Sequence, residues 1–245
     1  MFSFFKKKSN IILPEPPNLV VDLHSHLIPN IDDGAQDIEE SLRLLSGLQS
    51  LGYTKVITTP HIMIDAYGNT KTSVLKGLAL LKSRAKKEGI TLSIDAASEY
   101  YLDEGLLPLI KKKELLLINN TYLLFETSYN HRPKQLEETI FEILASGYTP
   151  LLAHPERYNY IKNVDEYHVL KEIGAHFQVN INSFNGYYGS HAKEYAHALS
   201  QHGLIDFLGS DTHHQKHIDN LKTVLQSDSY KKIYLHNTIK NPTLI

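Results

Sequence analysis

Short runs of apolar, often β-branched residues alternate along this chain with longer segments in which apolar residues recur every three or four positions. The short runs are typical of strands, and the longer segments are typical of helices with one buried face. The predicted strands cover residues 19–23, 55–59, 91–97, 122–125, 151–153, 177–181 and 207–209. The pattern therefore predicts a strand–helix repeat that runs from Leu19 to Gly209.

The predicted helices begin and end at residues with known capping preferences. Asp37 precedes the first helix, Glu40 follows three residues later as in a capping box, and Gly52 ends it. Further helices are expected over residues 71–88, 133–146, 164–173 and 190–201, each followed within two residues by a glycine. A short helix or turn is expected over 103–110. The tail is expected to hold one or two short helices and a turn at Asn241-Pro242.

Strand–helix alternation of this kind implies a parallel sheet and an α/β fold. Seven such units fit a closed barrel better than an open sheet, and a doubly wound sheet is the alternative. No linker or low-complexity break divides the chain. We therefore predict a single domain over residues 19–245, preceded by an N-terminal arm over residues 1–18.

The arm begins with Met1–Lys8, in which aromatic residues precede three lysines. Its apolar part is far too short to span a bilayer, and its basic residues follow the apolar ones, in the reverse order of a signal peptide. We therefore expect a cytoplasmic protein without stable membrane insertion. The arm itself is either flexible or a peptide that docks on a partner or on a membrane surface.

The composition narrows the chemistry. The chain has no cysteine, which excludes disulfides and every mechanism with a cysteine nucleophile. Its net charge of -2 provides no basic field for binding nucleic acid. The 14 histidines favour sites built from imidazole and carboxylate groups.

Polar side chains that can bind metals follow almost every predicted strand. His24 and His26 come after the first strand, and both can reach one point because residues i and i+2 of a strand face the same side. The other candidate ligands are Asp33 in the first loop and, after later strands, His61, Glu99, Glu126, His154, Asp211 and His213. Active sites of α/β barrels form at the C-terminal ends of the strands. We therefore predict a metal site there, supported by Asn182 as a hydrogen-bonding residue or a loop cap.

The number and type of these ligands indicate more than one ion. Five imidazoles and four carboxylates exceed what a single ion needs. Four neighbouring carboxylates without cations would also destabilise the fold by mutual repulsion. We expect two or three divalent ions. Mixed nitrogen and oxygen ligands favour manganese, iron or zinc over calcium or magnesium, and manganese is our first expectation.

Taken together, the motifs resemble those of the polymerase-and-histidinol-phosphatase (PHP) superfamily. They are most similar to the bacterial capsule and exopolysaccharide protein-tyrosine phosphatases of the CpsB/CapC/YwqE type. The matching segments are residues 22–26, 31–34, 58–61, 99–101, 125–126, 154–158, 178–180 and 210–213. They occur in the family's order and extend from Leu19 to about Asn241. The Asp-Asp-Gly and His-Pro-Glu-Arg-Tyr segments are the most specific to this branch.

The resemblance implies a distorted (β/α)7 barrel of the PHP type with a trinuclear metal site. In that arrangement one metal binds His24, His26, Glu99 and Asp211, a second shares Glu99 and adds Glu126 and His154, and the third binds Asp33, His61 and His213. The resemblance also implies a substrate, namely phosphotyrosine in the tail of a bacterial tyrosine autokinase. It leaves the oligomeric state open.

The chain departs from the family in its basic residues. Ile62–Ile64 follow His61, where family members often carry basic residues, and no arginine follows Arg157. Arg157 is predicted to bind the phosphate, and the alternative is an ion pair with Glu156 or with a helix carboxylate.

The source of a second phosphate-binding cation is therefore open. Lys216 or His217 would take that place, although a lysine acts as a point charge and not as a planar fork. Tyr158 is predicted to contact the substrate. Arg132 and His131 either line the mouth of the site or belong to the ordinary surface.

The predicted mechanism is hydrolysis without a covalent intermediate. A water acidified between two ions would attack phosphorus in line with the leaving phenolate. The metals and Arg157 would hold the non-bridging oxygens, and the predicted catalytic residues are Arg157, His61 and Asp211. Two rival functions stay open. One is another phosphoester hydrolysis at the same site, such as that of histidinol phosphate or of nucleic acid, and the other is a non-catalytic metal-bound scaffold.

Overall fold

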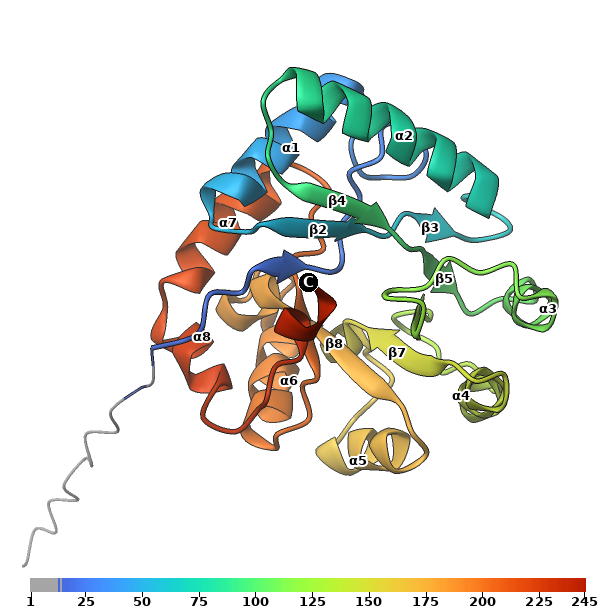
Figure 1. The fold of residues 1–245 in the computed structure, drawn as a ribbon. Helices are drawn as coiled ribbons and strands as arrows, with labels where there is room; N and C mark the ends of the chain where they lie inside the picture. Colours follow the sequence, from blue (N-terminus) through green and yellow to red (C-terminus); the bar gives the residue numbers. More distant parts are fainter. Residues whose placement is uncertain (1–12, 14) are drawn as a thin grey trace, which may run out of the picture.

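The computed structural model of this protein describes residue 13 and residues 15–245. Residues 1–12 and 14, which make up most of the predicted arm, lie outside the described residues. The described chain has an α/β fold in which every pairing between the named strands is parallel. The strands lie at the centre and the helices surround them (Figure 1).

The strands form two sheets. The three-stranded sheet has the order β1 (Val21–Asp22), β2 (Lys55–Thr58), β4 (Ser93–Ala96). The six-stranded sheet has the order β3 (His61–Ile62), β5 (Glu99–Tyr101), β6 (Tyr122–Glu126), β7 (Thr149–Ala153), β8 (His176–Asn180), β9 (Phe207–Gly209). The chain crosses from the smaller to the larger sheet twice, from β2 to β3 and from β4 to β5. The short strands β3 and β5 were not predicted as separate elements.

At the other edges of the sheets, isolated contacts join β1 and β9. An isolated parallel bridge pairs Ser25 with Thr212. The side chain of Asn241 donates hydrogen bonds to the carbonyl oxygens of Val21 and Leu208, so it takes the place of backbone pairing there. No continuous ladder among the described residues closes the ring of strands. The parallel α/β architecture is therefore confirmed, and the closed (β/α)7 barrel is not.

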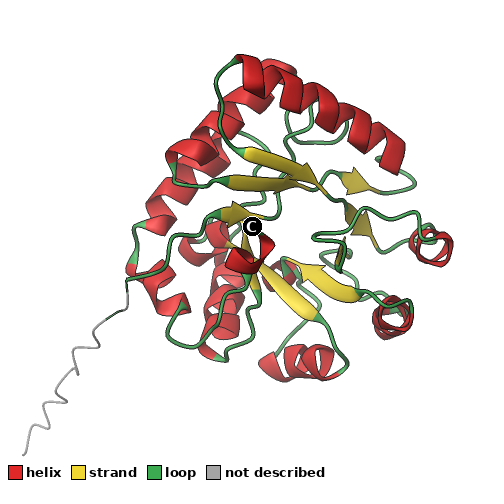
Figure 2. Cartoon of the chain, viewed as in Figure 1, coloured by secondary structure: helices red, strands yellow, loops and turns green. Residues whose placement is uncertain are grey.

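The α-helices lie outside the strands, as Figure 2 shows in red, whereas the short C-terminal helix lies near the middle of the ring of strands. They are α1 (Ile38–Ser50), α2 (Lys71–Lys87), α3 (Leu106–Lys112), α4 (Leu136–Ala145), α5 (Val164–Glu172), α6 (Ser190–Gln201), α7 (Gln215–Leu225) and α8 (Asp228–Ile233), with the 3-10 helices η1 (Pro155–Arg157), η2 (Ile181–Asn185) and η3 (Asn241–Leu244). None of the described helices is both long and apolar enough to cross a membrane.

The predicted helix ends are close to the observed ones, except that α3 and α4 each begin three residues later than predicted and one predicted capping box is incomplete. Asp37 caps α1 by accepting a hydrogen bond from the N–H of Glu40 at 2.7 Å. The carboxylate of Glu40 instead accepts from the N–H of Gln36, so the predicted capping box is only half formed. Helix α4 begins at Leu136 and not at Pro133, because the residues before it form a turn in which the N–H of Leu136 bonds to the carbonyl of Pro133.

Apolar side chains pack on both sides of the strands. One cluster fills the space between the strands and the surrounding helices. A smaller cluster lies inside the ring of strands and includes Val21, Ile57, Leu124 and Phe207. Leu244 of η3 packs into this inner cluster, and Figure 1 shows the C-terminus near the middle of the ring. Burial on both faces explains why the strand sequences are runs of apolar residues and not alternating ones.

Candidate metal centre

All nine predicted ligands converge at one site, which most of them reach from the carboxyl end of a strand, whereas His61 and Glu99 are the first residues of β3 and β5. They are His24 and His26 after β1, Asp33 in the loop before α1, His61 in β3, Glu99 in β5, Glu126 at the end of β6, His154 after β7, and Asp211 and His213 after β9. Their ligand atoms form four overlapping groups in which all atoms lie within 4.8 Å of one another: His26, Asp33, His61 and His213; His24, His154 and Asp211; His24, His26 and Glu99; and His61, Glu99 and Glu126. The predicted ligands therefore form one continuous site.

Glu99 occupies the centre of this site. Its side chain is fully buried. One carboxylate oxygen lies 3.2 Å from His24 Nε2, 3.4 Å from His26 Nε2 and 3.2 Å from His61 Nδ1. The other oxygen lies 3.0 Å from His154 Nε2. A carboxylate with imidazoles around both oxygens could be shared by two ions, as the family resemblance implies for Glu99.

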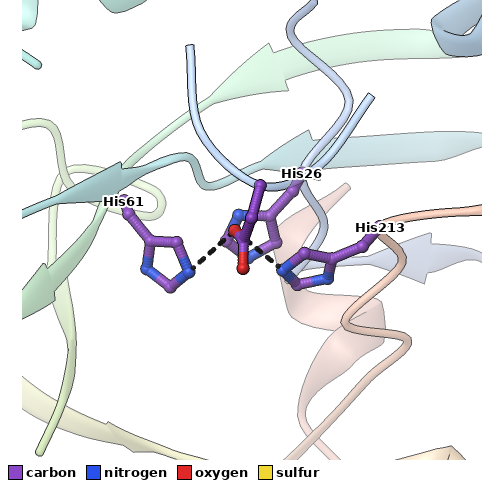
Figure 3. A group of neighbouring side chains, drawn as sticks. His26, His61 and His213 are labelled. Carbon is purple, nitrogen blue, oxygen red and sulfur yellow. Dashed lines mark ion pairs between the residues drawn. The ribbon is translucent and has the colours of Figure 1, made fainter. Parts of the chain in front are cut away.

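A second part of the site is more open and centres on Asp33. The Asp33 side chain is 52% exposed, and its Oδ1 lies 3.5 Å from His61 Nε2 and 3.4 Å from His213 Nε2. The rings of His26 and His213 stack with centroids 3.9 Å apart. Figure 3 shows His26, His61 and His213 brought together in this group. The structure thus unites the three residues implied for the third metal and adds His26 to them.

Two ligand histidines are oriented by residues that the sequence analysis did not assign to the site. His24 Nδ1 lies 2.6 Å from Gln178 Oε1, and His26 Nδ1 lies 2.8 Å from Asp32 Oδ2. Such partners fix the ring and leave the other nitrogen free for a metal. The available signals were the position of Asp32 beside Asp33 and a polar Gln178 within an apolar strand.

The hydrogen-bonded chain continues from Gln178 to a further ligand. Gln178 Nε2 donates to Asn180 Oδ1 at 2.9 Å, and Asn180 Nδ2 donates to Asp211 Oδ2 at 2.7 Å. Gly209 makes this approach possible. A Cβ at that position would lie 2.6 Å from Gln178 Nε2 and 2.9 Å from His24 Cβ. One row of amides therefore holds ligands from the two ends of the chain.

The buried charges shift one another's pKa. Burial opposes charge on His24, but the carboxylates of Glu99 and Asp211 outweigh burial and raise the His24 pKa to about 9. Burial would raise the pKa of Asp211, yet the charges of His24, His213 and Arg157 hold it well below its usual range. These carboxylates therefore stay ionised and require positive charge beside them.

This donor set suits divalent cations. Imidazole nitrogens and carboxylate oxygens in groups of three or four are the ligands that manganese, iron and zinc accept in proteins. Cations placed among them would balance four carboxylates that are otherwise matched only by imidazolium groups and by Arg157. The residues present therefore fit the metals that the family implies, without selecting one of them.

The backbone is strained at two ligand positions. His154 has φ 33° and Asp211 has φ 50°, in the left-handed region that residues other than glycine rarely adopt. Strain of this kind concentrates at functional sites, where the surrounding structure enforces it. At both positions it sets the direction of a ligand that follows a strand.

A cavity of about 330 Å³ opens over the ligands. It is lined by Asp33, His61, Glu99, Tyr129, His154, Arg157, Tyr188, Asp211, His213, His214 and His217. Arg157 Nη1 donates to Asp211 Oδ2 at 2.9 Å. Glu156, the alternative partner of Arg157, is instead buried and accepts hydrogen bonds from Asn180 N–H and Ser183 Oγ. The structure thus places the predicted phosphate-binding arginine beside the predicted metal ligands.

Comparison with known proteins identifies the family. The sequence profile described as "Capsular polysaccharide synthesis, CpsB/CapC" matches residues 20–241. This chain belongs to the CpsB/CapC family. It is 32% identical to the tyrosine-protein phosphatase YwqE of Bacillus subtilis (strain 168) over 80% of this chain and 78% of that protein. It is 30% identical to the putative tyrosine-protein phosphatase CapC of Staphylococcus aureus over 92% of this chain and 91% of that protein.

A solved structure agrees with the sequence comparison. It comes from work on YwqE of Bacillus subtilis and CpsB of Streptococcus pneumoniae, described as unique metal-dependent tyrosine phosphatases. It matches this chain with a TM-score of 0.79 and 30% identity, and it covers 88% of this chain and 90% of its own. The parallel α/β architecture of this CpsB/CapC protein is therefore shared with phosphatases described as metal-dependent.

Several residues predicted near the substrate lie away from the cavity in this CpsB/CapC protein. Tyr158 is fully buried, and its hydroxyl donates to the carbonyl of Ala153 and accepts from the N–H of Thr127. It has no free group for a substrate, so we no longer assign it a contact. Arg132 pairs with Glu137 and Glu166 and does not line the cavity. His131 is exposed and also lies outside the lining.

Neither candidate for the second cation provides a positive charge at the cavity. Lys216 is exposed and is not among the lining residues. His217 lines the cavity, but burial lowers its pKa to about 3, and its Nδ1 accepts a hydrogen bond from the N–H of His213. His217 is therefore neutral near pH 7. Asn182 is buried and donates to the carbonyl of His217, which places it as a supporting hydrogen-bonding residue.

Proposed function

We propose that this protein is a cytoplasmic, metal-dependent protein-tyrosine phosphatase, a phosphoric monoester hydrolase of class EC 3.1.3.48. Its substrate would be phosphotyrosine in the tail of a bacterial tyrosine autokinase that acts in capsule or exopolysaccharide synthesis. The observation that carries the proposal is the convergence of nine side chains that can bind metals, with Glu99 at their centre and Arg157 beside them. The relatives named as tyrosine-protein phosphatases support the choice of substrate.

Two or three divalent ions would occupy the site, with manganese first and iron or zinc as alternatives. Glu99 would be shared by ions at the centre of the site. The other ligands of these central ions would be His24, His26, Glu126, His154 and Asp211. The outer ion would be held by Asp33, His61 and His213. When bound, these ions would supply positive charge and a water of lowered pKa as the nucleophile.

The chain's own charged residues would bind and orient the phosphoryl group. Asp211 holds Nη1 of Arg157, so the remaining N–H groups of the guanidinium can donate to phosphoryl oxygens as a planar fork. His61 lines the cavity between Glu99 and Asp33. Arg157, His61 and Asp211 are thus the residues proposed for catalysis. A phenolate with a pKa of about 10 leaves without a strong proton donor, which agrees with a site rich in carboxylates.

The experiment that tests this function compares substrates at measured metal content. The protein is purified without chelator, its metals are quantified, and steady-state rates are measured on a phosphotyrosine peptide, histidinol phosphate and single-stranded DNA. We expect the highest kcat/KM on the phosphotyrosine peptide and loss of turnover after chelation. A higher kcat/KM on another substrate would replace the proposed reaction. Full metal content without turnover on any substrate would indicate a scaffold.

A substitution at one ligand tests the site itself. His154→Ala removes a buried candidate metal ligand beside Glu99 and should lower both bound metal and kcat/KM, the latter about 100-fold. His168→Ala is the matched control, because His168 lies on α5 beside His202 and away from the cavity. Far-UV circular dichroism should be unchanged in both variants. Normal turnover by the His154 variant would remove this site from the mechanism.

A further inference from the structure

The guanidinium of Arg157 lies between two tyrosine rings. Its central carbon is 4.6 Å from the ring centroid of Tyr129 and 4.3 Å from that of Tyr188. Tyr129 follows β6 and Tyr188 follows η2, and both line the same cavity. A cation close to two aromatic rings is attracted by both, so the side chain loses much of its freedom to rotate.

The hydrogen bond to Asp211 restrains the guanidinium from rotating within the plane of its own atoms. Nη1 donates to Asp211 Oδ2 at 2.9 Å, and that oxygen also accepts from Asn180 Nδ2 at 2.7 Å. Among the described residues, the other N–H groups of Arg157 make no hydrogen bond within the protein. The side chain is 21% exposed. A guanidinium held by two rings and by one nitrogen therefore keeps donors available for a ligand in the cavity.

The hydroxyl of Tyr188, which also lines the cavity, is a further hydrogen-bond donor beside Arg157. Its oxygen is buried and has no hydrogen-bond partner among the described residues. A buried polar atom without a partner destabilises the fold unless water or a ligand supplies one. Burial raises the pKa of Tyr188 well above its usual value, so the group stays protonated and can donate.

The cavity has no other permanent cation among the residues the structure describes. Arg157 is the only arginine or lysine in the lining. The oxygens of a phosphoryl group need several donors, and charged donors are the strongest. Apart from the bound metal ions, a single arginine would therefore need a neutral donor beside it to bind the remaining phosphoryl oxygens.

We infer that Tyr129 and Tyr188 form an aromatic clamp that positions Arg157 for a phosphoryl group, and that the Tyr188 hydroxyl donates a further hydrogen bond to that group in place of a second cation. Tyr129 is then a positioning residue, and Tyr188 both positions Arg157 and binds the phosphoryl group. The inference rests on the proposed function, because it concerns how the same cavity recognises phosphate.

The hydroxyl is tested by the binding of inorganic phosphate, measured by calorimetry on metal-loaded protein at equal metal content. Tyr188→Phe keeps the ring and removes only the donor. It should weaken phosphate binding, with a Kd about 10-fold higher than that of the wild type. Tyr187→Phe is the matched control, because Tyr187 is the adjacent tyrosine, is 37% exposed and does not line the cavity. It should leave the Kd within about twofold. An unchanged Kd for Tyr188→Phe would overturn the role of the hydroxyl.

The clamp is tested by the mobility of the arginine. The chain has only four arginines, so the Nε–H signals in a nitrogen-15 NMR spectrum of the zinc-loaded protein can be assigned by substitution. Tyr129→Leu and Tyr188→Leu should each increase the fast motion of the Arg157 signal, while the signal of Arg84, which pairs with Glu39 on the surface, stays as it is. Unchanged Arg157 motion in both variants would overturn the clamp.

These two readouts separate the inference from the proposed function. Neither depends on turnover, so a failure to hydrolyse phosphotyrosine would reject the function alone. Conversely, full hydrolysis of phosphotyrosine together with an unchanged phosphate Kd in Tyr188→Phe would reject the donor role alone. A rise in KM with little change in kcat for Tyr188→Phe is the kinetic result expected of a group that binds ground state and transition state equally.

Discussion

At the scale of single residues, the metal centre depends on side chains that do not reach a metal. Asp32 shows this most clearly. Its Oδ2 lies 2.8 Å from His26 Nδ1 and accepts a hydrogen bond from the N–H of His61, and its Oδ1 accepts from the N–H of Gly34. Burial would raise the Asp32 pKa, but the charge of His26 holds it well below its usual range. Asp32 therefore remains a carboxylate that fixes two ligands at once.

Asp32→Asn should weaken metal binding without unfolding the protein. An amide of the same shape loses the charge that orients His26, and losing such a partner typically costs about 10- to 100-fold in metal affinity or activity. Competition with a metal chelator measures the affinity. Asp37→Asn is the control, because Asp37 is exposed and asparagine caps a helix as well as aspartate. Equal affinities in the two variants would mean that Asp32 has no part in orienting the ligands.

At the scale of elements, the turn between β1 and α1 is built to bring Asp33 over the other ligands. The N–H of Ala35 donates to the carbonyl of His26 at 3.1 Å, which draws the turn onto the segment after β1. Gly34 lies at the closest point. A Cβ there would be 2.2 Å from His26 O and 2.4 Å from His26 Cβ. Only a glycine therefore lets the turn approach the ligand histidine.

Gly34→Ala should displace this turn and with it the outer metal group. We expect a lower number of bound metals per chain by elemental analysis, and a loss of stability of about 1–3 kcal/mol from overpacking. Gly68→Ala is the matched control, since a Cβ at Gly68 meets no atom within 4 Å. An unaltered metal content in the Gly34 variant would contradict the role of this turn.

At the scale of the whole molecule, an ion cluster joins distant segments near the amino ends of β8 and β9. Asp206 accepts from the N–H of Phe177 and from Lys240 Nζ, each at 2.8 Å, and it also pairs with Lys171 and with His176. Burial would raise the Asp206 pKa, but the hydrogen bond from His176 and the two lysines lower it below its usual range. The cluster ties α5, β8 and the segment after α8 together at the end opposite the metal site.

Asp206→Asn should lower the free energy of unfolding by about 1–3 kcal/mol at pH 7, since the lysines are partly exposed and their contribution is screened. Because the folded-state pKa is depressed, the ionic part of this stability is present above the unfolded pKa of about 4. It is lost as the pH falls from there toward the folded pKa. The difference between wild type and variant should therefore shrink below about pH 4 in urea unfolding.

A surface aspartate provides the control for this pH dependence. Asp65→Asn changes an exposed residue, so its unfolding free energy should stay within about 0.5 kcal/mol of wild type at each pH. The contradicting outcome is that the free energies of unfolding of wild type and the Asp206 variant differ by the same amount from pH 7 to pH 3. That result would show that the charge of Asp206 contributes no stability.

The sequence predicted the positions of the helices and strands better than it predicted which strands pair with one another. Apolar runs and capping residues located the main strands and helices to within a few residues, because those signals are local. Short strands such as β3 and β5 were missed, since two or three residues carry too little pattern to be separated from the strand before them. The contacts between β1 and β9 were also beyond reach, because they depend on the side chain of Asn241 from the far end of the chain.

The sequence by itself determined that the nine ligands would share one face, because parallel strands separated by helices all end on the same side. Only the tertiary structure decided how those ligands are held. Gln178 orients His24 across 154 residues of chain, and Arg157 lies between tyrosines from two separate loops. It also decided against Tyr158, whose hydroxyl is used within the fold. Local pattern specifies where a side chain leaves its strand, whereas its neighbours depend on packing between segments far apart in the sequence.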